Sequence, residues 1–168
     1  MTVAVMMGVS GSGKTTIAEG VAKREGWRLV EGDDFHPAAN VAKMKSGTPL
    51  TDEDRWPWLR AIAQEIDAIR GRGESAVVTS SALKRAYRDI LIAGRPDVFL
   101  VYLKGSRELI GQRMAARKGH FMPPALLDSQ FATLQEPAAD EHPIVVSIEP
   151  SPDEIVADVL RKLKERMA

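Results

Sequence analysis

The feature that most constrains the fold is a glycine-rich segment near the start of the chain. Residues Gly8 to Thr15 read GVSGSGKT and match the phosphate-binding loop G-x-x-x-x-G-K-[ST] at every specified position. An apolar run at 3–7 precedes the match and predicts a buried strand, and residues 15–24 after it predict a helix. Because this strand–loop–helix order is the context in which the motif binds phosphate, we expect a nucleoside triphosphate site here.

The residue types in this loop explain why it binds an anion. Its glycines let the backbone curl until successive N–H groups point inward, and the following helix adds its positive end. Lys14 is expected to bridge the terminal phosphates, and the Thr15 hydroxyl is expected to ligate Mg²⁺. The predicted nucleotide-binding residues of the loop and its helix are Gly8, Ser10, Gly11, Ser12, Gly13, Lys14, Thr15 and Thr16.

Length and composition limit the classes of protein to which the chain belongs. Its 168 residues fit a single domain with its own core. Lysine plus arginine and aspartate plus glutamate both number 23, so no net field favours nucleic acid or an anionic membrane. No apolar run is long enough for a bilayer span, no signal peptide is expected before the first strand, and the absence of cysteine excludes zinc–thiolate sites. We therefore expect a cytoplasmic protein.

Strand-like and helix-like stretches alternate along the chain, which is typical of a parallel sheet covered by helices. The predicted strands are 3–7, 28–31, 76–79, 98–104 and 144–148. The predicted later helices are 55–70, one through 83–91, 106–118, 125–134, and one that begins at Pro152 behind a Ser151–Glu154 capping box. The polar segment 36–54 is expected to hold one short helix. The pattern predicts a three-layer α/β fold with its site at the carboxyl ends of the strands.

Those strand ends carry reactive side chains. Asp33 and Asp34 follow the second strand, Ser80 and Ser81 follow the third, and Lys104 ends the fourth. One aspartate is expected to hold a metal-bound water, and the other to orient an acceptor hydroxyl and take its proton. We assign Asp33 as the base and as a metal-site residue because it lies directly behind the strand and Gly32. The alternative is that the pair only caps the next helix.

Cations and hydrogen-bond donors are concentrated around the second and third strands. They suit an anionic, hydroxyl-rich acceptor, because arginine binds a carboxylate through two parallel hydrogen bonds. Lysines on exposed helices are more often simply solvated. Three tryptophan and tyrosine side chains nearby, Trp56, Trp58 and Tyr87, are interpreted as core or pocket wall. The predicted acceptor-binding residues are Asp33, His36, Lys43, Arg55, Ser81, Lys84, Arg88 and His120, and Lys45 is a weaker candidate.

Two arginines precede a helix-breaking segment and suggest a lid. Arg113 and Arg117 lie one helical turn apart, and residues 119–124 with their glycine and two prolines interrupt the helical pattern. On closure, such a lid brings positive charge to the transferring phosphate and excludes water that would otherwise hydrolyse the nucleotide. Both arginines are predicted to contact the nucleotide, and Arg117 is predicted to be catalytic. The alternative is that Arg117 is an ordinary surface charge.

Several segments together resemble the gluconokinase family of small P-loop kinases. Beyond the phosphate loop, the resemblance rests on Glu31-Gly32-Asp33-Asp34-Phe35-His36-Pro37, Ser81-Ala82-Leu83-Lys84, Tyr87-Arg88-Asp89 and Gly119-His120-Phe121-Met122-Pro123. It extends over nearly the whole chain and is far more specific than the phosphate loop alone. Two departures are visible: Ser80 stands where a cysteine is expected, and Ile92 where a basic residue is common. Both are small changes.

The resemblance implies an activity, a fold and an assembly. The implied reaction is ATP-dependent phosphorylation of D-gluconate to 6-phospho-D-gluconate, with Mg²⁺ as cofactor. The implied fold is that of the nucleoside monophosphate kinases, with five parallel strands in the order 2-3-1-4-5, as one domain over residues 1–168. Within it we expect an acceptor-binding insert at about 34–73 and a lid at about 117–137. A homodimer is also implied.

Two other functions stay open at this point. A kinase of another small anionic acceptor, shikimate-like or a nucleoside monophosphate, is the nearest alternative, although the acceptor segment lacks the aromatic residues expected for base recognition. A P-loop module that only binds nucleotide as a switch belongs to a different class. Such a module requires neither the aspartate pair nor the two-arginine lid.

Overall fold

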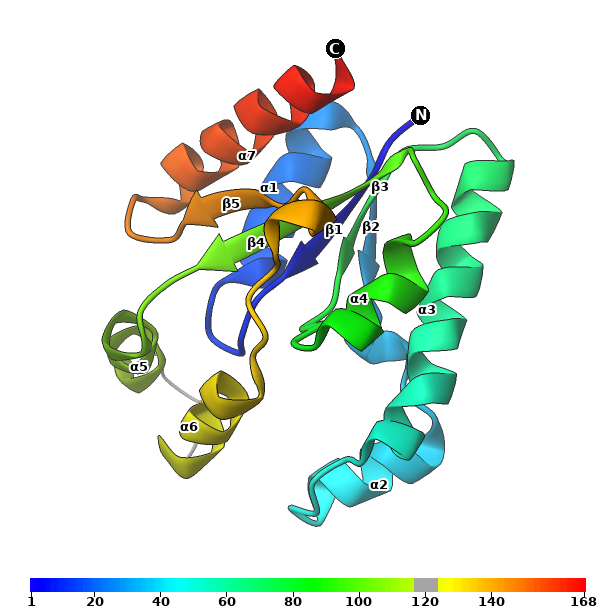
Figure 1. The fold of residues 1–168 in the computed structure, drawn as a ribbon. Helices are drawn as coiled ribbons and strands as arrows, with labels where there is room; N and C mark the ends of the chain where they lie inside the picture. The colour runs from blue at the N-terminus through cyan, green and yellow to red at the C-terminus, as the bar shows by residue number, and fades with distance from the viewer. Residues whose placement is uncertain (117–123) are drawn as a thin grey trace.

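A single parallel sheet with helices on both faces forms the molecule (Figure 1). The computed structural model describes residues 1–116 and 124–168, with the side chains of 124 and 125 left out. Its strands are β1 (Val3–Met7), β2 (Arg28–Glu31), β3 (Ala76–Thr79), β4 (Val98–Lys104) and β5 (Ile144–Ser147). They lie in the order β2-β3-β1-β4-β5, which confirms the predicted fold and strand order.

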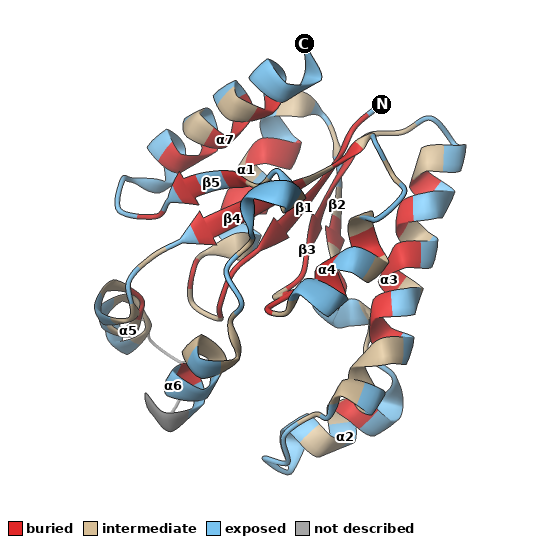
Figure 2. Cartoon of the chain, viewed as in Figure 1, coloured by how far each residue is buried: buried red, intermediate tan, exposed pale blue. Residues whose placement is uncertain are grey.

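Each face of the sheet packs against its own layer of helices. Alternate residues of β1 point to opposite faces, as strand geometry requires. Ala4 and Met6 enter the core that helices α1 (Lys14–Glu25) and α7 (Pro152–Met167) cover. Val3, Val5 and Met7 enter the core beneath α3 (Asp52–Gly71) and α4 (Arg85–Ile92). All five residues of β1 are fully buried (Figure 2), so the strand is packed rigidly up to the point where the phosphate loop begins.

The helix α3 begins earlier than the sequence analysis predicted. It starts at Asp52 rather than at 55, behind the N-cap residue Thr51. The Thr51 side chain accepts a hydrogen bond from the Asp54 amide, and the Asp54 carboxylate accepts one from the Thr51 amide. This reciprocal cap, formed by residues three positions apart, extends the helix into the predicted polar segment. Pro57 lies in the interior of the helix, which continues across it to Gly71.

The remaining helices agree closely with their predicted ranges. The short 3₁₀ helix η1 (Gly32–Phe35) precedes the polar segment, and the segment holds the helix α2 (Ala38–Lys45). The helix α5 is described over Arg107–Ala116, and α6 covers Pro124–Thr133, followed by the 3₁₀ helix η2 (Ala139–Glu141). Ser151 caps α7 by accepting a hydrogen bond from the Glu154 amide, whereas the Glu154 carboxylate binds the Ser151 hydroxyl instead of completing the reciprocal box.

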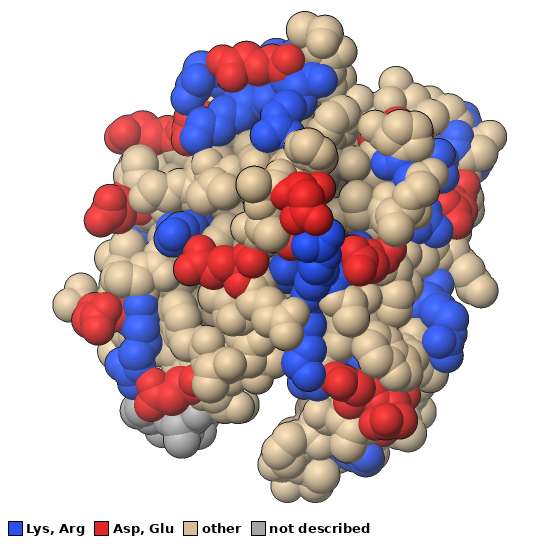
Figure 3. All heavy atoms as spheres, in the orientation of Figure 1, with Lys and Arg blue, Asp and Glu red and all other residues tan. Residues whose placement is uncertain are grey.

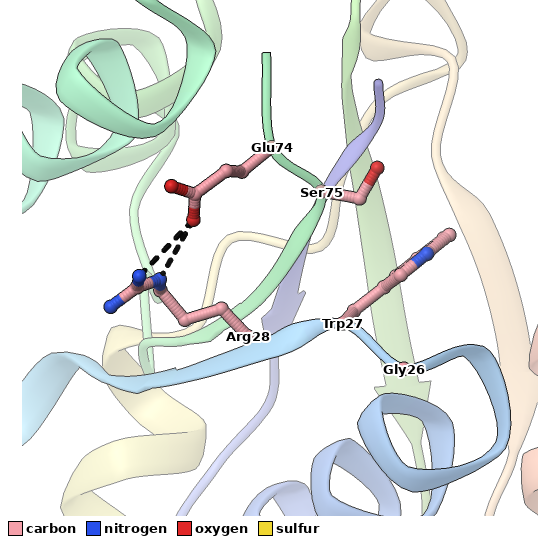
Figure 4. Close-up of a pocket in the computed structure, with 5 residues that line it drawn as sticks. All are labelled: Gly26, Trp27, Arg28, Glu74 and Ser75. Atoms are coloured by element: carbon pink, nitrogen blue, oxygen red, sulfur yellow. Dashed lines mark hydrogen bonds and ion pairs between the residues drawn. The ribbon is translucent and has the colours of Figure 1, made fainter. Parts of the chain in front are cut away.

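The carboxyl ends of the strands face the side of the molecule where α2, α5 and α6 project (Figure 1). The space-filling surface is hollowed on this side (Figure 3). A second depression lies at the opposite, amino ends of β2 and β3, lined by Gly26, Trp27, Arg28, Glu74 and Ser75 (Figure 4). There the Arg28 guanidinium is paired with Glu74. Among the described residues, no helix has an apolar stretch sufficient to cross a bilayer.

Candidate active site

The phosphate loop has the backbone that its glycines predicted. Gly11 and Gly13 have φ angles of 83° and 91°, in the left-handed region that side chains disfavour, and Gly13 is the N-cap of α1. The Lys14 ammonium donates to the carbonyls of Gly8, at 2.8 Å, and Val9, at 3.1 Å. Among the residues that the structure describes, the buried Ser12 hydroxyl has no hydrogen-bond partner. The loop thus supplies the curled backbone and helix terminus of an anion site.

The lysine of this loop is electrostatically unusual. Burial of the ammonium group lowers the pKa of Lys14 to about 8, while the negative charges of Asp33 and Glu31 act in the opposite direction. Both carboxylates are therefore close enough to Lys14 to influence its charge. A phosphate group bound in the loop supplies further negative charge and favours the protonated lysine.

Asp33 reaches this position because two strands approach each other closely at their ends. Gly32 precedes it, and a Cβ at Gly32 would lie only 2.1 Å from the carbonyl oxygen of Thr79 on the neighbouring strand. The buried Trp58 indole donates to the Gly32 carbonyl at 2.8 Å and fixes the turn from the α3 side. The 3₁₀ helix η1 then presents both Asp33 and Asp34 to solvent. Of the two, only Asp33 is among the charges that act on Lys14.

Glu31 is a site residue that the sequence analysis missed. As the last residue of β2, it places one carboxylate oxygen 2.6 Å from the Thr79 hydroxyl and 3.3 Å from the Thr15 hydroxyl, and both hydroxyls donate to it. Thr15 is the predicted magnesium ligand, so Glu31 lies beside that position. Its place at a strand end was the signal that could have revealed it.

The cations predicted to bind the acceptor are brought together by Asp52, a carboxylate that the sequence analysis did not assign to the site. Asp52 accepts hydrogen bonds from the Tyr87 hydroxyl and from the Lys84 ammonium, the latter at 3.2 Å. Arg55 donates to the Tyr87 hydroxyl at 3.1 Å. Hydrogen bonds from Tyr87 and then Lys84 lower the pKa of Asp52, and the Asp52 carboxylate in turn raises the pKa of Lys84. We call Asp52, Arg55, Lys84 and Tyr87 the acceptor cluster.

His36 and Lys43 lie beside the acceptor cluster with other partners. The His36 ring stacks on Trp58, with centroids 4.2 Å apart, and its Nε2 is 4.0 Å from the Asp33 carboxylate. Burial lowers the pKa of His36, which favours the neutral ring. Lys43 donates to the Asp54 carboxylate at 2.7 Å, and this bond is the largest cause that lowers the pKa of Asp54 to about 2.

The Arg88 side chain is buried within the protein rather than exposed beside the acceptor cluster. It is 1% exposed and is paired with Glu141, whose side chain is also largely buried, and it donates to the Ala82 carbonyl. This geometry does not support the predicted contact with substrate. Ser81 is half-buried in the segment ahead of α4. The Ser80 hydroxyl beside it is buried and has no hydrogen-bond partner in the described part of the chain.

A hollow of about 460 Å³ adjoins the phosphate loop on the β5 side of the sheet, away from β2 and Asp33. Arg113 lines it and donates to the Glu149 carbonyl at 3.4 Å. The lining residues are Gly11, Ser12, Gly13, Thr16, Ile17, Arg113, Glu149, Pro150, Ser151, Pro152 and Ile155. This volume lies in the range of small-molecule sites. Arg117 and His120, the other predicted lid residues, lie outside the described part of the chain.

The helix α6 contacts the phosphate loop through a residue that was not singled out. The Gln130 side-chain oxygen accepts a hydrogen bond from the Ser10 amide at 2.7 Å, and its nitrogen donates to the Ser10 hydroxyl at 2.9 Å. Gln130 is 120 positions away from Ser10, so only the tertiary structure reveals the pairing.

The loop fits a magnesium nucleotide by the chemistry of its donors. Within residues 1–116 and 124–168, the buried Ser12 hydroxyl has no hydrogen-bond partner, and the Lys14 ammonium is bound only to main-chain carbonyls. Thr15 offers a hydroxyl next to the Glu31 carboxylate, and hydroxyl and carboxylate oxygens are ligands that Mg²⁺ accepts, directly or through water.

Known proteins with similar sequences decide the family. The sequence model of the AAA domain family matches residues 3–137. The chain is 47% identical to a gluconokinase from Gluconobacter oxydans, over 94% of this chain and 88% of the relative. It is 43% identical to the thermoresistant gluconokinase of Escherichia coli, over 96% and 93% of the two chains. The chain belongs to the gluconokinase family. It is accordingly a P-loop kinase, as the sequence analysis expected.

Solved structures agree with this membership. A gluconokinase from Sinorhizobium meliloti superposes on this kinase with a TM-score of 0.89 at 41% identity, covering 98% of this chain and 92% of that one. A shikimate kinase from Aquifex aeolicus gives a TM-score of 0.64 at 13% identity, which shows a shared fold alone.

Proposed function

We propose that this kinase transfers the terminal phosphoryl group of ATP to D-gluconate, giving ADP and 6-phospho-D-gluconate. The observation that carries the proposal is the placement of Asp33. Its carboxylate is 4.0 Å from the His36 ring beside the acceptor cluster, and its charge acts on Lys14 of the phosphate loop. A phosphate donor and a hydroxyl acceptor held on these two sides meet at Asp33. The transfer is direct and in-line, because positioning and charge stabilisation suffice for phosphoryl transfer.

The nucleotide is held by the phosphate loop and the adjoining hollow. The inward-facing amides of the loop and Lys14 bind the phosphates, and the hollow beside Arg113 receives the nucleoside. Thr15, with Glu31 and Asp33 nearby, would hold Mg²⁺, which when bound neutralises charge on the phosphates. Gln130 already contacts the loop at Ser10 from α6.

Asp33 acts as the base in this proposal. It accepts the proton from the terminal hydroxyl of gluconate as the new phosphate ester forms. Its exposed carboxylate is accessible to a substrate, and His36 lies 4.0 Å away to orient it. Asp34, which points into solvent from the same 3₁₀ helix, is the alternative base.

The acceptor cluster binds the carboxylate end of the sugar acid. Arg55 and Lys84 supply positive charge, and Tyr87 supplies a hydroxyl. Asp52 partly neutralises these cations in the free kinase, so a bound carboxylate competes with Asp52 for them. Arg117 and His120 remain predicted contacts of the transferring phosphate and the substrate. The insert at 34–73, the lid at 117–137, a homodimer and a cytoplasmic location also remain predictions.

Kinases of other acceptors are not favoured. The gluconokinase relatives match over nearly their full length, whereas the shikimate kinase shares only the fold. The cluster of cations around Tyr87 suits a carboxylate. Trp56 meets Tyr87 edge to face, at an interplanar angle of 73°, rather than as a parallel pair between which a nucleobase would stack. A switch module would have no use for an acceptor cluster.

A coupled assay of ADP release tests the proposal. With ATP and Mg²⁺ in excess, we expect turnover that depends on D-gluconate, and a phosphorylated product at the terminal carbon by NMR. A screen of shikimate, gulonate and nucleoside monophosphates under the same conditions defines the acceptor. ADP release that is the same with and without every acceptor would contradict a kinase function.

A further inference from the structure

Arg88 is committed to protein contacts through all of its side-chain nitrogens. Nε and Nη2 donate to the two carboxylate oxygens of Glu141, at 2.6 and 3.2 Å, and Nη1 donates to the Ala82 carbonyl at 2.9 Å. The side chains of Arg88 and Glu141 are 1% and 8% exposed. A buried pair with satisfied hydrogen bonds holds a single geometry, because breaking it leaves a charge without a partner.

The pair connects two segments that are far apart in the sequence but hydrogen-bonded to each other. Arg88 belongs to α4, directly behind the segment 80–84, which we call the acceptor loop because it carries Ser81 and Lys84. Glu141 ends the segment 134–141, which we call the return segment because it leads from α6 back to β5. Burial alone would raise the pKa of Glu141, but hydrogen bonds from Arg88 and the Ala138 amide outweigh it and hold the pKa low. The pair therefore stays ionised.

The acceptor loop has a backbone conformation that needs support. Ala82 has a φ of 42°, in the left-handed region that residues other than glycine rarely adopt, and it is completely buried. Arg88 holds the Ala82 carbonyl, and the next carbonyl, that of Leu83, accepts a hydrogen bond from the Gln135 amide at 2.7 Å. Both supports come from outside the loop. Strain of this kind is characteristic of functional sites whose surroundings hold it in place.

We propose that Arg88 and Glu141 are positioning residues that fix the acceptor loop, and through it Lys84 of the acceptor cluster, against the return segment. Neither residue touches the substrate. Their pair holds the strained Ala82, and the chain leaves Ala82 in the direction that brings Lys84 to Asp52 and Tyr87. The inference rests on the proposed gluconate kinase function. It replaces direct substrate binding by Arg88 with an indirect role.

The same interface supplies a matched control. Arg85 and Asp140 form a second two-pronged ion pair between the same segments, with distances of 3.0 and 2.6 Å. Their side chains are 45% and 66% exposed. An exposed pair contributes little because water screens it and holding its side chains costs entropy. Asp140→Asn therefore removes an ion pair from this interface without touching Ala82.

The test compares Glu141→Gln and Arg88→Lys with Asp140→Asn in steady-state kinetics. We expect the KM for D-gluconate to rise about tenfold in the first two variants, with the KM for ATP within about twofold of wild type, because only the acceptor side is displaced. Asp140→Asn should keep both values. KM does not depend on the folded fraction, so it stays readable at low temperature if a variant is destabilised. Arg88→Lys provides a second case with the charge retained.

Two results overturn the inference. One is an unchanged gluconate KM together with a lowered Tm, which shows a purely structural pair. The other is an equal rise in both KM values, which shows a general loss of the site. Wild-type protein without gluconate-dependent turnover would instead contradict the proposed function itself.

Discussion

The phosphate loop and the acceptor cluster lie at the same edge of the sheet but are assembled in different ways. The loop comes from eight consecutive residues, and its geometry follows from glycines and from the helix directly behind it. The cluster takes Asp52 and Arg55 from the start of α3, and Lys84 and Tyr87 from the start of α4. Each of its side chains is held by another member. The comparison teaches that backbone groups can form an anion site locally, whereas a side-chain site needs the tertiary fold.

The largest expected effect is on the loop side. Lys14→Ala should reduce kcat by about 10³-fold or more, because a preorganised positive charge on the phosphates is lost. The measurement is ADP release at saturating D-gluconate. Lys14→Arg serves as control for charge alone, and a Lys14→Ala rate close to wild type would remove Lys14 from the catalytic residues.

The next effect lies where the two regions meet. Asp33→Asn should lower kcat by about 10²-fold, since a general base of this kind contributes that much, while ATP binding by calorimetry is kept. Asp34→Asn is the matched control from the same 3₁₀ helix and should change kcat little. If Asp34→Asn is the more damaging change, the base has been assigned to the wrong aspartate.

Two glycine substitutions compare the phosphate loop with the turn at the end of β2, because Gly13 and Gly32 are needed for different reasons. Gly32→Ala should lower the free energy of unfolding by about 3 kcal/mol, because its Cβ would meet the Thr79 carbonyl at 2.1 Å. Gly13→Ala meets no atom within 4 Å and should lower it by about 1 kcal/mol through its φ of 91°. Urea unfolding measures both. Equal losses would mean that the close approach of β2 to β3 relaxes freely.

The smallest effect concerns the charge of Lys14. Its pKa is lowered to about 8 in the folded protein, against 10.5 in the unfolded chain. Between these two values the unfolded state binds more protons, so this group makes folding more favourable as pH rises through that window. The unfolding free energy of wild type, measured relative to that of Lys14→Ala, should therefore rise by on the order of 1 kcal/mol between pH 7.5 and pH 9.5. A difference that does not change with pH would indicate that the pKa of Lys14 is not shifted in the folded protein.

The sequence predicted the fold because its signals are local. The phosphate motif fixed the first strand, the loop and α1, and alternating apolar runs located the other strands. The strand order came from the family resemblance and is confirmed by the sheet. The start of α3 was the main error in the helices, and it came from overlooking the Thr51–Asp54 cap.

The site was only partly readable for the opposite reason. Lys14 and Thr15 were predicted from the motif, Asp33 from its place behind a strand, and Arg55 from a concentration of cations. Glu31, Asp52 and Gln130 were missed, because each gains its role from a partner at least 16 positions away.

The sequence by itself determined the phosphate loop and the order of the strands and helices along the chain. Local glycine conformations and hydrogen bonds between near neighbours build the loop and the helices, and apolar runs mark the buried strands. Only the tertiary structure decided the roles of the charged side chains. Arg55 and Lys84 are partly exposed beside Asp52, whereas Arg88, one turn beyond Lys84, is buried against Glu141. A cation in a sequence does not reveal which carboxylate it will meet, because the packing of distant segments sets its burial and its partner.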